Sequence, residues 1–249
     1  MEHKIEYNNI LQKIPIPNNI PIFNTKGRLV IVLLEFRIMP EILYVINALL
    51  YIYNQDYEIG FSIVYGKTNQ DYIEEHFINW ENIKLINTGV INHDSISYSR
   101  MLMKPQFWEN FNNWSHVLIY QTDALLLQKI PDKYFELDYI GAPWKYILQG
   151  AGNGGFSLRN IKKMIYVCEK FRDIDEKDIP GTHEDNYFSK QKELKFIEPI
   201  RCDDHKRFSV ETLYYPEPIG IHCIYERLNV NNKKWNYLIN YIKNIFNIK

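Results

Sequence analysis

The feature that most constrains the fold is an unbroken apolar run at residues 28–35, RLVIVLLE. A strand with one face in water alternates apolar and polar residues, whereas a continuous run is typical of a strand buried on both faces. Other elements must therefore cover such a strand above and below. A chain of 249 residues with 46% hydrophobic content can supply them in one large α/β domain or two small ones.

Helical and strand patterns alternate after this run. Residues 40–54 have helical periodicity with Pro40 in the first turn, and residues 59–65 (IGFSIVY) form a second apolar strand pattern. Further helices are predicted at 69–79 and 95–111, and further strands at 83–87 and 116–120. This order predicts an α/β fold with a mostly parallel, doubly wound sheet and flanking helices. Ligands of such sheets bind beyond the carboxyl ends of the strands, so the residues after Tyr120 should line a site.

The two ends of the chain have different sequence patterns. Residues 1–27 contain Pro15, Pro17 and Pro21 and are predicted to form an irregular, peripheral N-terminal arm. Residues 28–249 are predicted to form a single domain, since we find neither an internal repeat nor a second domain. Within it, residues 232–249 place apolar side chains on one helical face. That helix is expected to pack on the domain, with a membrane-surface helix as the alternative.

Composition and charge exclude several classes of protein. The 29 basic and 30 acidic residues give a net charge of −1, which leaves no basic field for nucleic acid. The longest apolar stretch, residues 42–53, is too short for a transmembrane segment of about 18 or more residues. Cys168, Cys202 and Cys223 fit a reducing compartment and form neither a disulfide frame nor a zinc pattern.

The N-terminal sequence MEHKIEYNNI lacks the apolar core of a signal peptide, so we expect a cytoplasmic protein. The sequence is rich in Asn, Ile, Lys and Tyr, which is typical of AT-rich genomes. A giant virus, a protist or an AT-rich bacterium would fit this composition, and a viral protein would act in the host cytoplasm.

The predicted site begins with Gln121, Thr122 and Asp123, directly after the strand HVLIY. An acid there is placed to reach a metal-bound diphosphate, because Mg²⁺ and Mn²⁺ take carboxylate and phosphate oxygens as ligands. The alternative is an ordinary Asp at a strand-to-turn junction. His222, which follows a Pro-rich loop, could complete a metal site with Asp123, although a lone His is more often structural.

Two segments between Asp123 and His222 contain an aromatic residue and a glycine cluster that could contact a ligand. Residues 138–144 (DYIGAPW) end in Trp144, whose flat apolar face suits a sugar ring. The alternative is a core Trp beside a turn. Residues 152–159 (GNGGFSLR) hold three glycines in four residues, which indicates close backbone approach or positive φ. The G-x-G-x-x-G spacing here lacks the preceding strand of a dinucleotide-binding motif and is weak.

An acidic pair, Glu184 and Asp185, follows in HEDNYF. Thr182 and Asp185 resemble a capping box at a helix start. An acid fixed at a helix N-terminus is held rigidly, and the helix dipole favours its ionised form. A general base must be ionised, so capping and catalysis are compatible.

Taken together, these motifs resemble an uncharacterised family of glycosyltransferase-like domains of GT-A type. The resemblance covers roughly residues 98–222, and it is the ordered set of motifs that is specific. The motifs are QTD at 121–123, DYIGAPW at 138–144, GNGGFSLR at 152–159, EDxYF at 184–188, FSxE at 208–211 and GxH at 220–222.

The resemblance implies a role for each polar motif. Asp123 corresponds to the surviving acid of the D-x-D motif that binds metal and nucleotide diphosphate, and Gln121 stands where the first acid would be. Asp185 corresponds to the base of inverting enzymes, with Glu184 in that role if the register differs. His222 corresponds to a late metal-binding His.

The remaining donor contacts follow from the same resemblance. Thr122 and Trp144 are expected in the donor site. The segment expected to lie against the donor sugar comprises Asn153, Gly154, Gly155 and Phe156.

The resemblance therefore implies a GT-A-like single domain that moves a hexose from a nucleoside diphosphate sugar, a UDP-sugar above all, to an acceptor hydroxyl with inversion. The acceptor would be a glycan or a protein, and the cofactor Mn²⁺ or Mg²⁺, with metal dependence left open by Gln121. One alternative is a catalytically degenerate module that binds a nucleotide sugar or glycan. Another is a structural α/β protein whose glycines and acids serve only turns and caps.

Overall fold

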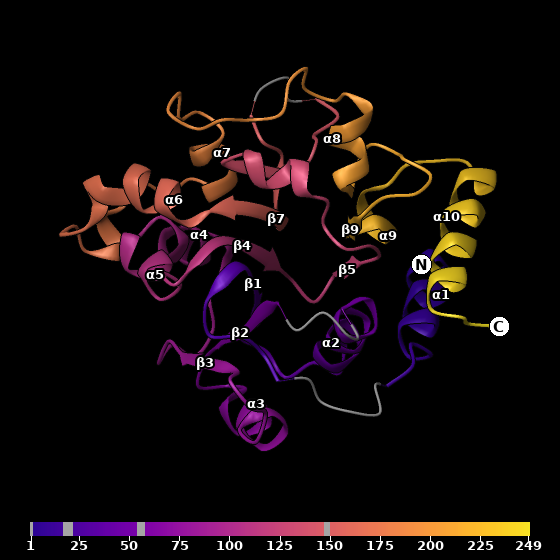
Figure 1. The fold of residues 1–249 in the computed structure, drawn as a ribbon, viewed down its shortest axis with the longest axis horizontal. Helices are drawn as coiled ribbons and strands as arrows, with labels where there is room; N and C mark the ends of the chain where they lie inside the picture. Colours follow the sequence, from indigo (N-terminus) through magenta and orange to yellow (C-terminus); the bar gives the residue numbers. More distant parts are fainter. Residues whose placement is uncertain (1, 17–21, 54–57, 147–149) are drawn as a thin grey trace.

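The computed structural model describes residues 2–16, 22–53, 58–146 and 150–249. Its centre is a six-stranded sheet in the order β3-β2-β1-β4-β7-β6 (Figure 1). Strands β1 to β4 run parallel, and β7 is antiparallel to both β4 and β6. The strands of this sheet are β1 (Gly27–Leu34), β2 (Ile59–Tyr65), β3 (Lys84–Asn87), β4 (Trp114–Tyr120), β6 (Tyr139–Ala142) and β7 (Asn153–Asn160).

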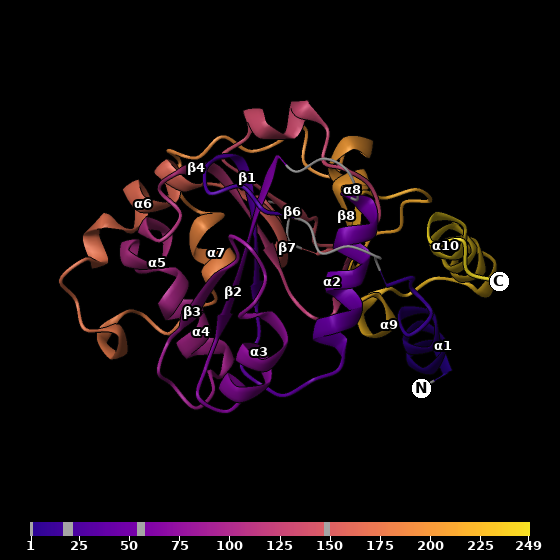
Figure 2. The ribbon, with the colours of Figure 1, turned by 60° about the horizontal axis from the view of Figure 1, so that its bottom comes forward.

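Helices cover both faces of this sheet, and Figure 2 shows α2 on one side with α5, α6 and α7 on the other. The α-helices are α1 (Glu2–Leu11), α2 (Glu41–Ile52), α3 (Gln70–Phe77), α4 (Ser95–Leu102), α5 (Pro105–Glu109), α6 (Ile161–Cys168), α7 (Glu184–Phe188), α8 (Asp203–Phe208), α9 (Ile224–Arg227) and α10 (Asn232–Ile245). Short 3₁₀ helices lie at Asp132–Glu136, Glu169–Phe171 and Glu176–Asp178.

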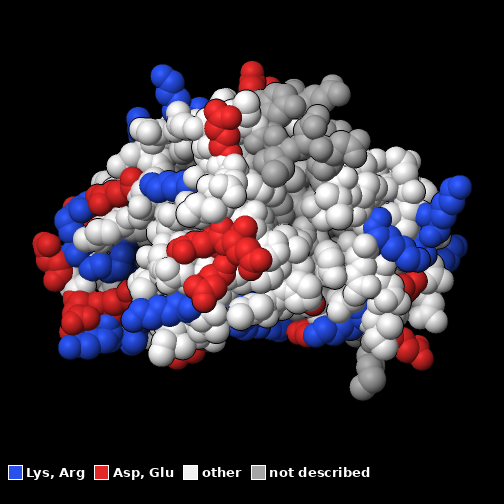
Figure 3. Space-filling model, turned by 90° about the horizontal axis from the view of Figure 1, so that it is seen from below, with Lys and Arg blue, Asp and Glu red and all other residues white. Residues whose placement is uncertain are grey.

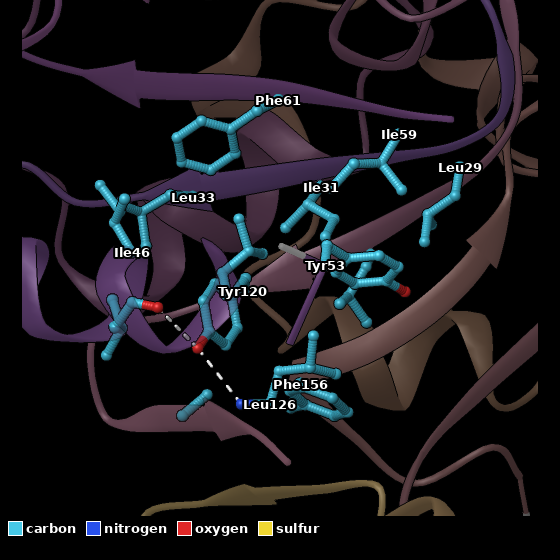
Figure 4. Close-up of a cluster of buried hydrophobic side chains, with 14 of the residues drawn as sticks. Leu29, Ile31, Leu33, Ile46, Tyr53, Ile59, Phe61, Tyr120, Leu126 and Phe156 are labelled. Atoms are coloured by element: carbon cyan, nitrogen blue, oxygen red, sulfur yellow. Dashed lines mark hydrogen bonds between the residues drawn. The ribbon is translucent and has the colours of Figure 1, made fainter. Parts of the chain in front are cut away.

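The central strand β1 is buried on both faces, as its unbroken apolar run predicts. Ile31 and Leu33 belong to the core beneath α2 and α3, part of which is drawn in Figure 4. Val30 and Val32 belong to the opposite core, beneath α4 to α7. Side chains that alternate across a strand supply one core each. The predicted α/β fold with a mostly parallel sheet and flanking helices is confirmed.

A second, three-stranded sheet lies beyond the end of β4. Its order is β5 (Ala124–Leu126), β9 (Gly220–His222) and β8 (Ser209–Val210), with β5 antiparallel and β8 parallel to β9. The Tyr120 hydroxyl donates to the Val45 carbonyl oxygen at 3.1 Å and accepts from the Leu126 amide at 3.2 Å (Figure 4). These bonds fix the turn between β4 and β5, which carries the predicted site.

The two ends of the chain pack together, since α1 lies beside α10 in both Figure 1 and Figure 2. Residues 2–11 are helical, so the predicted irregular arm is wrong there. Tyr7, Ile10 and Leu11 are buried in a third core that also contains Trp235 of α10. Their spacing makes one helical face, and Pro15 follows the helix instead of interrupting it. Pro17 and Pro21 lie outside the described residues.

The C-terminal helix is present and ends at Ile245, with its apolar face in this third core. The three cysteines are free. On the face seen in Figure 3, basic and acidic side chains are intermixed. None of the helices in the described ranges combines the length and apolarity that a membrane span requires. The division of the chain into an arm and one domain stays a prediction.

Candidate active site

A cavity of about 810 Å³ opens beyond the carboxyl ends of β1 and β4, where ligands of such sheets bind. Its walls come from the turn after β4, strand β7, the start of α7, strand β9, and helices α1 and α9. All but one of the predicted site residues line it. They are Gln121, Thr122, Asp123, Trp144, Asn153, Gly154, Gly155, Glu184, Asp185 and His222.

Phe156 is the exception. Its ring is buried, and its centroid lies 6.1 Å from that of the Tyr120 ring (Figure 4). The centroid of the Phe208 ring lies 5.6 Å away. Because successive side chains of a strand point to opposite faces, Gly155 faces the cavity and Phe156 faces the core. The structure thus places the Phe156 side chain away from any ligand in this cavity.

The second sheet brings Asp123 and His222 together from distant parts of the chain. Ala124 of β5 pairs with His222 of β9, and the Cys223 amide donates to the Asp123 carbonyl oxygen at 2.9 Å. Asp123 Oδ1 lies 3.2 Å from His222 Nε2. Gln121 Oε1 lies 3.2 Å from the same nitrogen, while Gln121 Nε2 donates to the Tyr98 hydroxyl.

Glu211 completes this group from the other side of the imidazole. It directly follows β8, is buried, and places Oε1 3.5 Å from His222 Nδ1. Sequence analysis placed Glu211 in the FSxE motif without a role, because the two-residue strand β8 leaves no periodic signal. We call Asp123, Glu211 and His222 the His222 cluster.

The electrostatics of the His222 cluster favour ionised groups. Burial alone would lower the pKa of His222, but Asp123 and Glu211 raise that pKa to about 9. The imidazole is therefore protonated at neutral pH. Burial alone would raise the pKa of Asp123, but the adjacent His222 imidazole, 3.2 Å away, holds that pKa below its usual value.

Three buried atoms of the His222 cluster have no hydrogen-bond partner in the described part of the chain: Asp123 Oδ1, Glu211 Oε2 and His222 Nδ1. Unsatisfied oxygens fit a divalent cation, and Asp123, His222 and the Gln121 carbonyl oxygen form a possible donor set. No group of three or more His, Cys, Asp or Glu residues with metal-binding geometry occurs in the described ranges. Further ligands would have to come from substrate or water, and His222 would have to lose its proton to bind a metal.

The glycines of β7 allow close approach, as predicted. A Cβ at Gly155 would lie 2.1 Å from His222 Nε2, and one at Gly154 would lie 2.2 Å from Glu184 Oε1. Gly152 has a φ of 98°, in the left-handed region that favours glycine. Asn153 Oδ1 accepts from the Gly155 amide at 2.7 Å and fixes the start of the strand.

Glu184 is committed to a buried ion pair. Its Oε1 accepts from Arg159 Nη2 at 2.8 Å, and both side chains are almost fully buried. The Arg159 guanidinium also lies 4.5 Å from the ring centroid of Tyr139. A carboxylate that neutralises a buried guanidinium is poorly placed to accept a proton, so Glu184 is the weaker candidate for a base.

Asp185 has no such partner. No ion pair with Asp185 is found among the described residues, and its Oδ1 accepts only from the Asn186 amide, at 2.7 Å. Burial, and then the charge of Glu184, raise the pKa of Asp185 to about 6. A cavity-lining acid with a pKa near neutrality has the property of a general base.

Two expectations about this helix start are wrong. The N-cap of α7 is His183, without a side-chain cap bond, so Thr182 and Asp185 do not form a capping box. The pKa of Asp185 rises, since burial and Glu184 outweigh the dipole of this short helix.

Thr122 and Trp144 occupy different parts of the wall. The Thr122 hydroxyl donates to Glu35 Oε2 at 2.8 Å, and Arg37 binds both oxygens of the same carboxylate. Thr122 therefore ties the turn after β4 to the segment after β1. Trp144 is half-buried and lies in the cavity wall.

Sequence analysis missed several residues of the lining. Glu35 and Arg37 follow the carboxyl end of β1, so the rule that located Asp123 could have found them. The residues from α1 gave no signal, because that helix precedes the first strand. They are Lys4, Tyr7, Asn8 and Leu11.

Solved structures with a similar fold are glycosyltransferases of low identity. GlyE from Streptococcus pneumoniae is 15% identical, with 89% of this chain and 62% of that chain covered and a TM-score of 0.48. S. aureus TarS is 12% identical, with 65% and 54% covered and a TM-score of 0.44. A glycosyltransferase involved in glycosylation of the major capsid of PBCV-1 is 11% identical, with 86% and 99% covered and a TM-score of 0.42.

The chain thus spans about 62% of the length of GlyE. A search of curated proteins found no relative. A family model matches residues 81–222, more than half of the chain, and this segment holds every predicted site residue. The chain belongs to the family that this model describes, Protein of unknown function (DUF5672).

Proposed function

We propose that this chain is a glycosyltransferase that moves a hexose from a nucleoside diphosphate sugar, a UDP-sugar, to an acceptor hydroxyl of a glycan or protein, with inversion. One observation carries the proposal. The unpaired Asp185, with its raised pKa, faces the same cavity as the His222 cluster with its unsatisfied atoms. A base and a diphosphate site that share one cavity are what this transfer needs.

Different residues would bind the diphosphate and the sugar of the donor. Asp123, His222 and Gln121 hold the diphosphate end, and Mn²⁺ or Mg²⁺, when bound there, offsets negative charge on the leaving group. Gly154 and Gly155 let Glu184 and His222 pack against the strand that faces the donor, and the Trp144 ring offers the sugar an apolar face.

In the transfer itself, Asp185 accepts the proton of the acceptor hydroxyl. The acceptor oxygen forms a bond to the anomeric carbon, through an oxocarbenium-like state. The bond from that carbon to the diphosphate breaks, and its electron pair leaves with the diphosphate oxygen. Attack opposite the leaving group inverts the anomeric configuration.

The test is a titration of the full chain with UDP, GDP and their sugars, with and without Mn²⁺, followed by a release assay on each donor that binds. We expect metal-dependent UDP binding and slow UDP release from one sugar donor. Asp185→Asn should lower turnover at least about 100-fold with donor affinity close to wild type, since a positioned base contributes about 10²–10⁴-fold.

Asp203→Asn is the matched control, because Asp203 is an exposed acid in the first turn of α8, outside the cavity lining. It should leave turnover unchanged. Full turnover in Asp185→Asn would remove the assigned base. Failure to bind any nucleotide with any metal would remove the proposed function.

A second candidate is a module that binds a nucleotide sugar or glycan without turnover. Gln121 favours it, because a neutral amide stands where the first acid of a D-x-D motif would be. Both candidates predict stabilisation by UDP and Mn²⁺, of about 2.7 kcal/mol for a ligand at 100 times its dissociation constant. They differ in turnover, since the binding module would hold the donor without releasing UDP.

A further inference from the structure

Helix α1 contributes one of its faces to the cavity, although it lies outside the matched family segment 81–222. The cavity-lining residues of α1 are spaced at i, i+3, i+4 and i+7, which is a single helical face. They are Lys4, Tyr7, Asn8 and Leu11. This wall of the cavity therefore comes from outside the segment that the family model matches.

The position of α1 beside the His222 cluster is fixed by side-chain contacts. Trp235 Nε1 donates to Glu6 Oε2 at 2.8 Å, and the rings of His3 and Trp235 stack with centroids 3.9 Å apart. The ring of Tyr7 packs on Tyr225 of α9 at 5.4 Å. Since α9 begins two residues after His222, these contacts hold α1 at the diphosphate end of the cavity.

The Tyr7 hydroxyl has an unmet hydrogen-bonding need. Tyr7 is only 1% exposed, and its hydroxyl has no hydrogen-bond partner in the described ranges of the chain. Buried polar groups in folded proteins are nearly always bonded, so such a hydroxyl calls for a ligand. Burial, Tyr120, Tyr225 and then Asp123 raise the pKa of Tyr7 well above its usual value, so the hydroxyl stays protonated and can donate.

The charges on this side of the cavity are mixed, because the acid Glu226 lines it beside two cations. Lys4 lines it, with Nζ over the Tyr225 ring at 5.2 Å and 3.9 Å from Glu226 Oε1. Arg227 of α9 also lines it. We propose that α1 forms a wall of the donor site and that the Tyr7 hydroxyl donates a hydrogen bond to a diphosphate oxygen of the bound nucleotide. This inference rests on the proposed function.

Tyr7→Phe tests the hydroxyl alone, with Tyr134→Phe as the matched control. The hydroxyl of the buried Tyr134 donates to the Asp204 carbonyl oxygen at 2.9 Å, outside the cavity lining. Calorimetric titration with UDP and Mn²⁺ should show at least about tenfold weaker binding for Tyr7→Phe, since a bond to a charged oxygen is lost. Tyr134→Phe should bind like wild type.

Stability of the ligand-free protein should show the reverse order. Tyr7→Phe removes an unpaired hydroxyl, so its midpoint of urea unfolding should equal or exceed that of wild type. Tyr134→Phe loses a hydrogen bond, and its midpoint should fall. A fall for Tyr7→Phe as large as that for Tyr134→Phe would show a hydroxyl already satisfied in the free protein and would overturn the inference.

A second pair tests the face of α1. Asn8 lines the cavity, whereas the neighbouring Asn9 is exposed and lies outside the lining. Asn8→Ala should weaken UDP binding several-fold, and Asn9→Ala should not change it. If the wild type binds UDP and both Tyr7→Phe and Asn8→Ala bind it equally well, this inference is overturned while the proposed function stands. Absence of nucleotide binding by the wild type would overturn the proposed function and this inference with it.

Discussion

Two buried charge clusters lie behind neighbouring glycines of β7, and they differ in how completely they are neutralised. Behind Gly154, Arg159 and Glu184 form a pair with one acid for one cation. Behind Gly155, the His222 cluster has two acids for one imidazole, and several of its buried atoms lack partners. The first cluster is closed in charge, although Arg159 Nη1 has no hydrogen-bond partner among the described residues. The second has an excess acid and therefore capacity left for a ligand.

This difference teaches which buried charges point to function. A closed pair is held by its own hydrogen bond, and its removal is expected to affect folding above all. An open cluster carries a cost in the free protein that a ligand can relieve. Asp185 belongs with the open cluster although it follows Glu184 in sequence, because successive residues of a helix point about 100° apart.

The largest expected effect is loss of the closed pair. Glu184→Gln would leave the fully buried Arg159 without its acid, and removal of one partner of a buried pair costs about 3–5 kcal/mol. Urea unfolding should show this loss of stability. Glu169→Gln, at the more exposed pair with Arg172, should stay close to wild type. Equal, small effects at both pairs would mean that the Arg159 pair is not structural.

The open side should behave in the opposite way. Asp185→Asn should raise the free energy of unfolding at pH 7 by up to about 3 kcal/mol, since a rise in pKa from 3.8 to about 6 makes the ionised form costly in the fold. The cost is absent below about pH 4, where Asp185 is protonated in both states, develops between about pH 4 and pH 6, and is complete at higher pH.

Urea unfolding of wild type and Asp185→Asn at pH 4 and pH 8 measures this cost. The two proteins should differ at pH 8 and converge at pH 4. A variant less stable than wild type at pH 8 would show that Asp185 has a stabilising partner and a structural role.

The glycines allow the two clusters to be disturbed separately. Gly154→Ala would press on Glu184 Oε1, and Gly155→Ala on His222 Nε2, at 2.2 and 2.1 Å. Overpacking costs about 1–3 kcal/mol, which Gly154→Ala should show in full as lost stability. Gly155→Ala should instead lose most in Mn²⁺-dependent UDP binding. Calorimetry and urea unfolding on both variants measure these losses. If both variants lost mainly stability, or both lost mainly UDP binding, the difference between the two clusters would be contradicted.

Sequence analysis could predict the parallel strands of the main sheet and the place of the candidate site. Apolar runs long enough to show periodicity gave β1, β2 and β4, and the rule for parallel sheets then located Asp123. The second sheet could not be predicted from sequence periodicity, because β8 and β9 are only two and three residues long. Glu211 therefore had no assigned place.

Helix α1 shows a different limit. Its face toward the cavity depends on contacts with α9 and α10, which join the two ends of the chain and leave no local pattern. The pKa of Asp185 depends likewise on burial and on the direction of the Glu184 side chain. Residue types and spacing predicted most of the polar groups that line the cavity, whereas tertiary packing decided which of them are paired.

The smallest expected effect tests whether the open cluster is a cation site. Gln121→Asp would restore an acid beside His222 Nε2, where the Gln121 oxygen now lies at 3.2 Å. A third carboxylate should tighten Mn²⁺ binding about tenfold in a calorimetric titration. Gln121→Asn has the same size without the charge, so it controls for the lost hydrogen bond to Tyr98. Binding of Mn²⁺ that is no tighter in Gln121→Asp than in Gln121→Asn would mean that the spare capacity of the His222 cluster serves the diphosphate directly, through the charge of the imidazolium.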